Sequence, residues 1–204
     1  MFFIVLLTGP TGSGKTNLLQ KLVDLGEQVI DLEKLCNHRG SAFGGFNQPV
    51  QPIQADFNDQ LLITFNSFDP KRPVFVEQKG QSVGQLKMPM WFIQYLNNKM
   101  VIFLNVALPL RVEQIMETYQ HETDQQLREA LKKMRTRLSP EISYRASQYL
   151  DSGNRYDFIR EMLAYYDTKI GYLGHYQAWN YCLTIETKDQ FGGALNDILR
   201  LAYS

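Results

Sequence analysis

Near the start of the chain, Gly9 to Thr16 have the residue types and the spacing of a phosphate-binding loop. They read Gly-Pro-Thr-Gly-Ser-Gly-Lys-Thr, which fits the pattern GxxxxGK(S/T) at every position. The glycines admit backbone torsions that other residues avoid, so successive N–H groups can surround an anion. We expect Lys15 to reach the terminal phosphates of a ligand and the Thr16 hydroxyl to bind Mg²⁺. The loop residues predicted to bind the ligand are Gly9, Gly12, Ser13, Gly14, Lys15 and Thr16.

The metal would also need a carboxylate, and three acidic residues are candidates. The apolar run at 74–76 leads directly into Glu77, which we predict to be both a metal ligand and a catalytic residue. Asp31 or Glu33, after another apolar run, could instead hold the metal, act as a base or bind a ribose, because the carboxyl ends of parallel strands face the ligand crevice. For all three residues, the alternative is a carboxylate that only caps a loop.

A glycine-bearing loop supplies further candidate side chains. Residues 38–41 read His-Arg-Gly-Ser and combine an imidazole, a guanidinium and a hydroxyl. Because such loops lie over the phosphates in proteins with this motif, we expect His38 and Ser41 to bind the ligand and Arg39 to act in catalysis. The alternative is a turn in which Arg39 pairs with a structural carboxylate.

The pattern of apolar residues predicts the elements that hold these loops. Residues 2–7 form a continuous apolar run, as in a strand buried on both faces of a parallel sheet. After the glycine-rich loop, leucines at 18, 19, 22 and 25 recur at helical spacing. Further strands are predicted at 28–32, 73–77, 100–106 and 181–185, and further helices at 54–68, 88–98, 109–120 and 189–203.

This alternation of strands and helices predicts the α/β fold class. We expect a mostly parallel sheet flanked by helices, of the P-loop NTPase type. Residues 124–179 depart from the alternation with helix after helix, which predicts a helical insertion or lid before the last strand. At 204 residues, the chain is expected to form a single P-loop domain over 1–204 that includes this helical subregion.

Composition excludes several classes of protein. Hydrophobic residues make up 44% and charged residues 21%, which indicates a globular rather than a disordered chain. Lys plus Arg and Asp plus Glu balance at 21 each, so contact with nucleic acid would have to come from a local patch. Cys36 and Cys182 have no CxxC spacing, which argues against a disulfide framework. The opening apolar run is too short to span a membrane, so we expect a cytoplasmic protein without membrane contact.

One local patch of positive charge is visible in the predicted helical subregion. Arg128, Lys132 and Arg135 fall at i, i+4 and i+7 and would share one helix face, with Lys133 and Arg137 close by. We predict that these five residues contact the phosphates of a nucleic acid. The alternative is an ordinary solvated helix face.

Beyond the phosphate-binding loop, the chain resembles the tRNA 2-selenouridine synthase family over nearly its whole length. The most distinctive matches are Gln-Val-Ile-Asp-Leu-Glu at 28–33 and His-Arg-Gly-Ser at 38–41. The other matches are the loop at 9–16, Phe43-Gly44, Gln54, Phe57, Val76-Glu77, Val83-Gly84, Pro89, Pro109, Arg111, Tyr119, Arg137-Leu138 and Tyr165-Tyr166-Asp167.

This resemblance implies a transferase that acts on the wobble uridine of certain tRNAs, with tRNA as its partner. Members of the family geranylate 2-thiouridine with geranyl diphosphate and then replace the sulfur by selenium from selenophosphate. The loop would then hold a diphosphate or selenophosphate with Mg²⁺, rather than necessarily a nucleotide such as ATP. Lys15 and Arg39 would stabilise the charge that develops on the departing diphosphate.

A geranyl chain would also need an apolar slot near the loop. The alternative for apolar residues there is packing in the core, as is usual for Met and aromatic residues at helical spacing. The candidates for such a slot are Phe43, Phe46, Met88, Met90, Trp91 and Phe92.

The chain also departs from the family pattern. Family members usually begin with a rhodanese-like domain whose cysteine serves the selenium step, whereas Met1 stands only a few residues before the loop here. The chain would therefore be a counterpart that works with a separate rhodanese-domain protein, a fragment, or a divergent homologue. Cys36 lies where the family commonly has alanine, and we do not expect it to be catalytic. The family tends to place a second acid soon after Glu77, whereas residues 78–80 read Gln-Lys-Gly, which indicates a weakened metal or catalytic site.

Two other functions fit the phosphate-binding motif. A nucleotide or small-molecule kinase or ATPase shares it, and Pro109 and Arg111 with the basic helical stretch could form a lid that carries transfer-site arginines. A non-catalytic tRNA- or partner-binding module would bind the phosphate ligand without turning it over.

Overall fold

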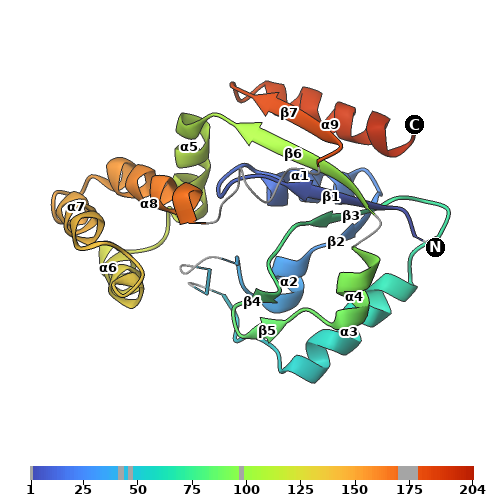
Figure 1. The fold of residues 1–204 in the computed structure, drawn as a ribbon, viewed down its shortest axis with the longest axis horizontal. Helices are drawn as coiled ribbons and strands as arrows, with labels where there is room; N and C mark the ends of the chain where they lie inside the picture. Colours follow the sequence, from blue (N-terminus) through green and yellow to red (C-terminus); the bar gives the residue numbers. More distant parts are fainter. Residues whose placement is uncertain (1, 41–43, 46–47, 97–98, 170–178) are drawn as a thin grey trace.

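Five parallel strands form the central sheet of the protein (Figure 1). The computed structural model describes residues 2–40, 44–45, 48–96, 99–169 and 179–204. The strand order is β2-β3-β1-β6-β7, so β1 lies between β3 and β6 in the middle of the sheet. The strands are β1 (Ile4–Thr8), β2 (Gln28–Ile30), β3 (Val74–Glu77), β6 (Lys99–Val106) and β7 (Tyr181–Ile185).

Helices cover both faces of the sheet because successive side chains of each strand point to opposite faces. On one face, Val5 and Leu7 of β1 pack with α1 (Lys15–Asp24) and α9 (Gln190–Ala202). On the other face, Ile4 and Leu6 belong to a second core with three helices. These are α2 (Leu32–Cys36), α3 (Gln54–Asn66) and α4 (Met90–Tyr95). The predicted α/β class with a parallel sheet is confirmed.

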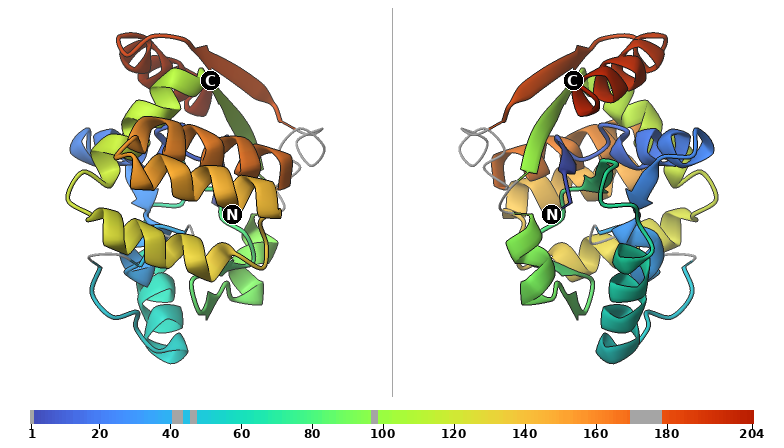
Figure 2. Two further views of the ribbon diagram at one scale, coloured as in Figure 1. Left: turned by 90° about the vertical axis from the view of Figure 1, so that its left-hand side faces the viewer. Right: turned by 90° about the vertical axis from the view of Figure 1, so that its right-hand side faces the viewer.

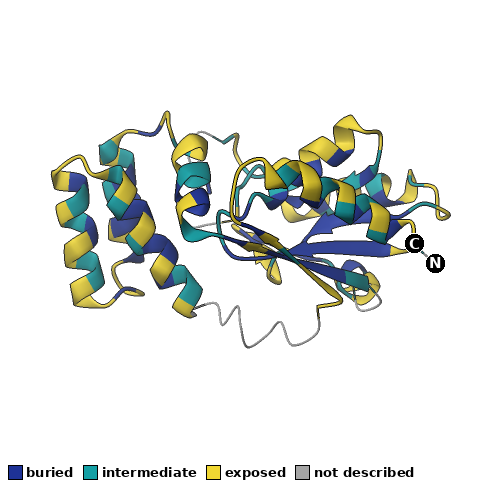
Figure 3. Ribbon diagram, turned by 90° about the horizontal axis from the view of Figure 1, so that it is seen from above, coloured by how far each residue is buried: buried dark blue, intermediate teal, exposed yellow. Residues whose placement is uncertain are grey.

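Four helices form a lobe beside the sheet, which we call the helical lobe. They are α5 (Leu108–Thr118), α6 (Asp124–Met134), α7 (Pro140–Asp151) and α8 (Arg155–Lys169). Their inward faces are buried in a third core, whereas their outward faces are exposed (Figure 3). Figure 2 shows α6, α7 and α8 crossing side by side at one side of the molecule. The predicted run of helices is confirmed as far as Lys169, and 170–178 lie outside the described residues.

Several local features differ from the sequence-based expectation. Strand β2 ends at Ile30, because the next residue, Asp31, accepts a hydrogen bond from the Lys34 N–H and caps the short helix α2. A small antiparallel hairpin of β4 (Ser82–Val83) and β5 (Leu86–Lys87), absent from the prediction, joins β3 to α4. The single domain over 1–204 stays a prediction. No helix within the described residues has both the length and the apolar character that crossing a bilayer requires.

Candidate functional site

The phosphate-binding loop connects the central strand β1 to α1 and needs glycine for steric reasons. Gly9 and Gly12 have positive φ values of 147° and 79°. A Cβ atom on Gly9 would lie 2.6 Å from the Leu104 carbonyl oxygen, and one on Gly12 would lie 2.9 Å from the Arg111 carbonyl oxygen. Because backbone atoms cannot move away as a side chain can, the loop requires glycine at both positions.

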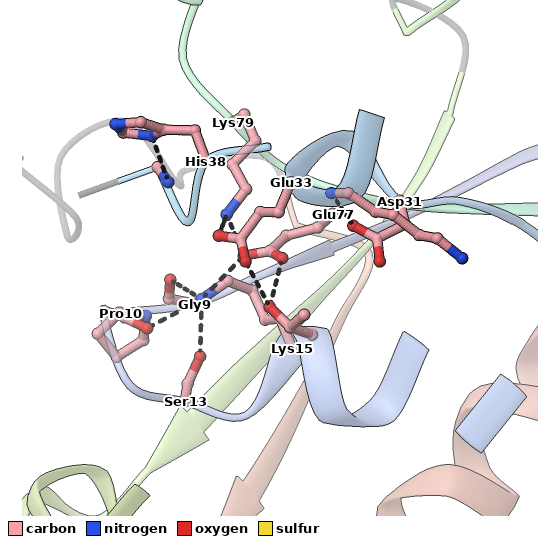
Figure 4. Close-up of polar contacts among 12 residues, drawn as sticks. Gly9, Pro10, Ser13, Lys15, Asp31, Glu33, His38, Glu77 and Lys79 are labelled. Carbon is pink, nitrogen blue, oxygen red and sulfur yellow. Dashed lines mark hydrogen bonds and ion pairs between the residues drawn. The ribbon is translucent and has the colours of Figure 1, made fainter. Parts of the chain in front are cut away.

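Lys15 lies inside this loop rather than in solvent (Figure 4). Its Nζ donates to the carbonyl oxygens of Gly9 at 3.0 Å and Pro10 at 2.9 Å, and to Ser13 Oγ at 2.9 Å. Burial lowers the pKa of Lys15 to about 8, although Glu77 opposes this shift. The Lys15 ammonium is therefore held within the phosphate-binding loop, where the motif predicts that it meets a phosphate.

The carboxylates of Glu33 and Glu77 converge on the next loop residue, Thr16. The Thr16 Oγ1 donates to Glu77 Oε2 at 3.0 Å and lies 3.5 Å from Glu33 Oε2. Burial disfavours the ionised form of both acids. For Glu77, the charges of Lys79 and Lys15 outweigh burial and hold its pKa below the usual range, whereas burial raises the pKa of Glu33. Of the three acidic candidates, Glu33 and Glu77 thus lie beside the loop.

Lys79 is a member of this cluster that the sequence analysis did not assign to the site. Its Nζ donates to Glu77 Oε1 at 2.9 Å and to Glu33 Oε1 at 2.5 Å (Figure 4). The only sequence signal was a basic residue two positions after the candidate metal ligand Glu77.

The oxygens of Thr16, Glu33 and Glu77 are the ligand type that Mg²⁺ prefers. The Lys79 ammonium, however, lies between the two carboxylates, and this arrangement does not fit a magnesium ion. Within the described residues, no group of three or more His, Cys, Asp or Glu side chains is suited to hold a metal. The metal predicted at Thr16 and Glu77 therefore stays a prediction.

Arg39 pairs with a buried carboxylate of the helical lobe. Its Nη1 lies 3.4 Å from Glu122 Oε1, and its guanidinium carbon lies 5.4 Å from the centre of the Tyr119 ring. This contact is the structural ion pair that the sequence analysis gave as the alternative for Arg39. Arg39 nevertheless lines the cavity described below, so its catalytic role stays a prediction.

The other two candidates of this loop have different outcomes. His38 Nδ1 accepts a hydrogen bond from the Gly40 N–H at 3.0 Å, and His38 is not among the cavity-lining residues. Burial and the nearby Lys79 lower the pKa of His38, which favours the neutral ring. His38 therefore shapes its own loop in this structure, and its predicted ligand contact stays a prediction. Ser41 lies outside the described residues.

Arg111 joins the loop to the helical lobe. Its Nε donates to the Thr11 carbonyl oxygen at 2.8 Å, while its two terminal nitrogens bind Asp167 of α8 in a bidentate pair, each at 2.8 Å. Its side chain is only 6% exposed. The guanidinium of Arg111 is occupied by these protein acceptors. It is therefore not free to bind a phosphoryl group, as the transfer-site arginine considered for a kinase would have to.

A cavity of about 980 Å³ lies between the loop and the helical lobe. Its polar side includes the phosphate-binding loop, Glu33, Glu77 and Lys79. Its other side, which we call the apolar wall, comes from α5, α6 and α8. The wall consists of Ile115, Met116, Leu127, Phe158, Ile159, Met162 and Leu163.

The apolar slot predicted from the sequence was wrong for its described residues. Met88 and Phe92 are buried in the core below the sheet, and Trp91 packs against that core. Met90 is 68% exposed. None of these four residues lines the cavity, and Phe43 and Phe46 lie outside the described residues.

Of the three basic residues expected to share one helix face, Arg128 and Lys132 lie on α6, whereas Arg135 follows its last residue. Arg128 pairs with Asp151 of α7 at 3.2 Å, and helix α6 ends at Met134, before the last two basic residues. Within the described part of the chain, no ion pair holds the other four. These are Lys132, Lys133, Arg135 and Arg137, all of which are exposed.

Cys36 is fully buried at the end of α2. Burial raises the pKa of its thiol to about 12, which leaves essentially no thiolate at neutral pH. This agrees with the expectation that Cys36 is not catalytic.

The lowered pKa of Lys15 predicts that anion binding weakens as the pH rises. Above about pH 8 the ammonium loses its proton, so affinity for sulfate, whose own charge stays constant, should fall by up to about tenfold per pH unit. Calorimetric titration on both sides of that pH measures the effect. In the Lys15→Arg variant the side chain stays charged, so its affinity should not change with pH. An equal decline in this variant would assign the effect to another group.

The chain is similar to known proteins in sequence and in fold. A family model described as the tRNA 2-selenouridine synthase AAA domain matches residues 2–183. The tRNA 2-selenouridine synthase of Nitrosomonas europaea is 38% identical over 119 residues, which are 57% of this chain and 30% of that protein. That of Hydrogenovibrio crunogenus is 32% identical over 190 residues, 81% of this chain and 51% of that protein. Among solved structures, shikimate kinase from Bacteroides thetaiotaomicron aligns over 99% of both chains with a TM-score of 0.48 and 16% identity.

The matched part is about half or less of the length of these curated relatives. The family model, in contrast, covers nearly the whole of this chain, including the phosphate-binding loop, the carboxylates of the site and the helical lobe. The chain belongs to the family of the tRNA 2-selenouridine synthase AAA domain.

Proposed function

We propose that this chain is the phosphate-binding domain of a transferase that modifies the wobble uridine of tRNA. The reaction would be of the 2-thiouridine geranylation and selenation type, with geranyl diphosphate or selenophosphate as the second substrate. Membership of the family supports the tRNA-modifying class. The observation that carries the choice of a prenyl diphosphate is the cavity, because a single space combines a phosphate-binding loop with an apolar wall.

The two sides of the cavity match the two parts of a prenyl diphosphate. Lys15, the loop N–H groups and the amino-terminal end of α1 would bind the diphosphate. The chain of the substrate would lie along the apolar wall, where burial of its hydrocarbon surface would contribute to affinity. A nucleotide has no hydrocarbon chain to place against Met116, Phe158 and Met162.

The proposed transfer step needs charge stabilisation more than proton transfer. The sulfur of 2-thiouridine would attack the first carbon of the geranyl chain, and the bond from that carbon to oxygen would break with its electron pair on the diphosphate. Lys15 would stabilise this growing charge, and Arg39 would contribute from the cavity rim. Glu77 accepts hydrogen bonds from Thr16 and Lys79, so we assign it a positioning role.

In the family that the chain resembles, the selenium step uses a cysteine. Neither cysteine among the described residues lies in the cavity. Cys36 is buried with a raised pKa, and Cys182 is exposed on β7 and does not line the cavity. We therefore propose that a rhodanese-type domain outside the residues of this chain would provide that thiol, in agreement with the partner expected from the sequence.

Calorimetric titration with geranyl diphosphate and, separately, with Mg·ATP tests the proposed ligand. The chain should bind geranyl diphosphate, and Lys15→Ala should weaken binding by about tenfold or more, because it removes the buried ammonium at the diphosphate. A thermal melt should show that the variant is folded. Tight Mg·ATP binding with no response to geranyl diphosphate would instead favour a kinase or ATPase. Binding without turnover in the presence of tRNA would favour the non-catalytic module.

The apolar wall is tested by two matched methionine variants. Met116 lines the cavity at 37% exposure, whereas Met90 is 68% exposed and lies elsewhere. Met116→Gln should weaken binding of geranyl diphosphate by about threefold to tenfold, because a polar amide replaces an apolar contact, and should leave inorganic pyrophosphate unaffected. Met90→Gln should bind both ligands like the unaltered chain. If the two variants lose affinity equally, the apolar wall does not bind the geranyl chain.

The basic residues at the end of α6 are tested by charge reversal. We expect the triple variant Lys132→Glu, Lys133→Glu and Arg135→Glu to weaken tRNA binding by about tenfold or more and to reduce its salt dependence, because three phosphate contacts are lost. The control makes the same change of net charge at exposed lysines outside the helical lobe. It combines Lys21→Glu, Lys71→Glu and Lys87→Glu. Equal losses in filter-binding assays would show an effect of net charge rather than of this surface.

A further inference from the structure

Lys79 is a charged residue of the cavity to which the proposed transfer step gives no task. It follows the last residue of β3 by two positions, and its ammonium lies between the carboxylates of Glu33 and Glu77 (Figure 4). Its side chain is 12% exposed, so it is mostly removed from solvent. It lines the same cavity as Lys15 and Thr16, which are the residues expected to meet the phosphates.

The Lys79 ammonium binds the same two carboxylates that a metal ion beside Thr16 would use, but through their other oxygens. Glu33 and Glu77 each have one oxygen near Thr16 Oγ1, at 3.5 Å and 3.0 Å, which is the kind of set that holds Mg²⁺ beside a phosphate. Their other oxygens bind Lys79, at 2.5 Å and 2.9 Å. A magnesium ion bound by Thr16 and both acids would therefore lie close to the positive charge of Lys79.

The formal charges of the cluster are already balanced. Lys15 Nζ lies 3.8 Å from Glu77 Oε1, so two ammonium groups face two carboxylates. Before a ligand binds, a dication would add two uncompensated positive charges in a mostly buried place, which is costly. Within the described residues, the hydrogen bonds of Lys79 Nζ go to the two carboxylates, and an ammonium has three donors. One N–H of Lys79 is therefore available to a phosphate oxygen in the cavity.

We propose that the Lys79 ammonium replaces the divalent cation at this site, so that the chain binds a diphosphate without Mg²⁺. Lys79 neutralises Glu33 and Glu77, keeps them from repelling the ligand, and donates one N–H to it. The inference rests on the proposed function only in that the ligand carries a diphosphate group.

Calorimetric titration with geranyl diphosphate, in excess EDTA and in excess MgCl₂, tests this inference. The unaltered chain should have the same Kd in both conditions within about twofold. Lys79→Met keeps the length of the side chain and removes its charge. Its affinity should fall by about tenfold or more in EDTA and recover in MgCl₂, because the freed carboxylates and Thr16 can then hold the metal. Lys87→Met, at an exposed position on β5, is the control and should match the unaltered chain.

Each result has a definite meaning. If the unaltered chain binds geranyl diphosphate about tenfold more tightly with Mg²⁺, the proposed function stands and the role of Lys79 is overturned. If Lys79→Met is folded and binds like the unaltered chain in EDTA, the role is also overturned. If the unaltered chain binds in neither condition, the proposed ligand is wrong and the inference fails with it. Should Lys79→Met fail to fold in a thermal melt, the comparison of EDTA with MgCl₂ in the unaltered chain still decides.

Discussion

The contacts of Arg111 determine where the helical lobe lies relative to the phosphate-binding loop. A single guanidinium binds the Thr11 carbonyl oxygen of the loop and both carboxylate oxygens of Asp167 on α8. The backbone of Arg111 also lies so close to Gly12 that a Cβ there would be 2.9 Å from its carbonyl oxygen. The cavity exists because these contacts hold an apolar wall on one side and a phosphate-binding loop on the other. Loss of these Arg111 contacts would therefore disturb both the phosphate-binding loop and the apolar wall.

The second constraint is electrostatic. Lys15, Lys79, Glu33 and Glu77 are all largely buried, and buried charges are tolerated only when they are paired and hydrogen-bonded. Each of the four has such partners here, and the Thr16 hydroxyl donates to Glu77 and lies near Glu33. The cluster is thus a pre-arranged set of charges next to the loop. A ligand with a diphosphate group would meet donors that are already oriented, which is the condition for strong electrostatic stabilisation.

The fold could be predicted largely because it depends on local periodicity. The continuous apolar runs predicted the ends of β1 and β3 to within two residues, and leucine spacing predicted α1. The exceptions are elements controlled by one or two hydrogen bonds. The Asp31 cap ended β2 early and started α2, and the hairpin β4–β5 is held by a two-residue ladder without a clear alternating pattern. Such features are too short for periodicity to detect.

By itself, the sequence determined the parallel α/β class, the phosphate-binding loop and the presence of a helical subregion, because each depends on residues that are neighbours along the chain. Tertiary structure alone decided which side chains meet in the site. Lys79 joins Glu33 across 46 positions, and Arg39 joins Glu122 across 83. The apolar wall likewise combines residues of α5, α6 and α8, whereas the aromatic residues near 90 pack under the sheet. No local pattern encodes these encounters, since they follow from how the helical lobe and the strands pack against each other.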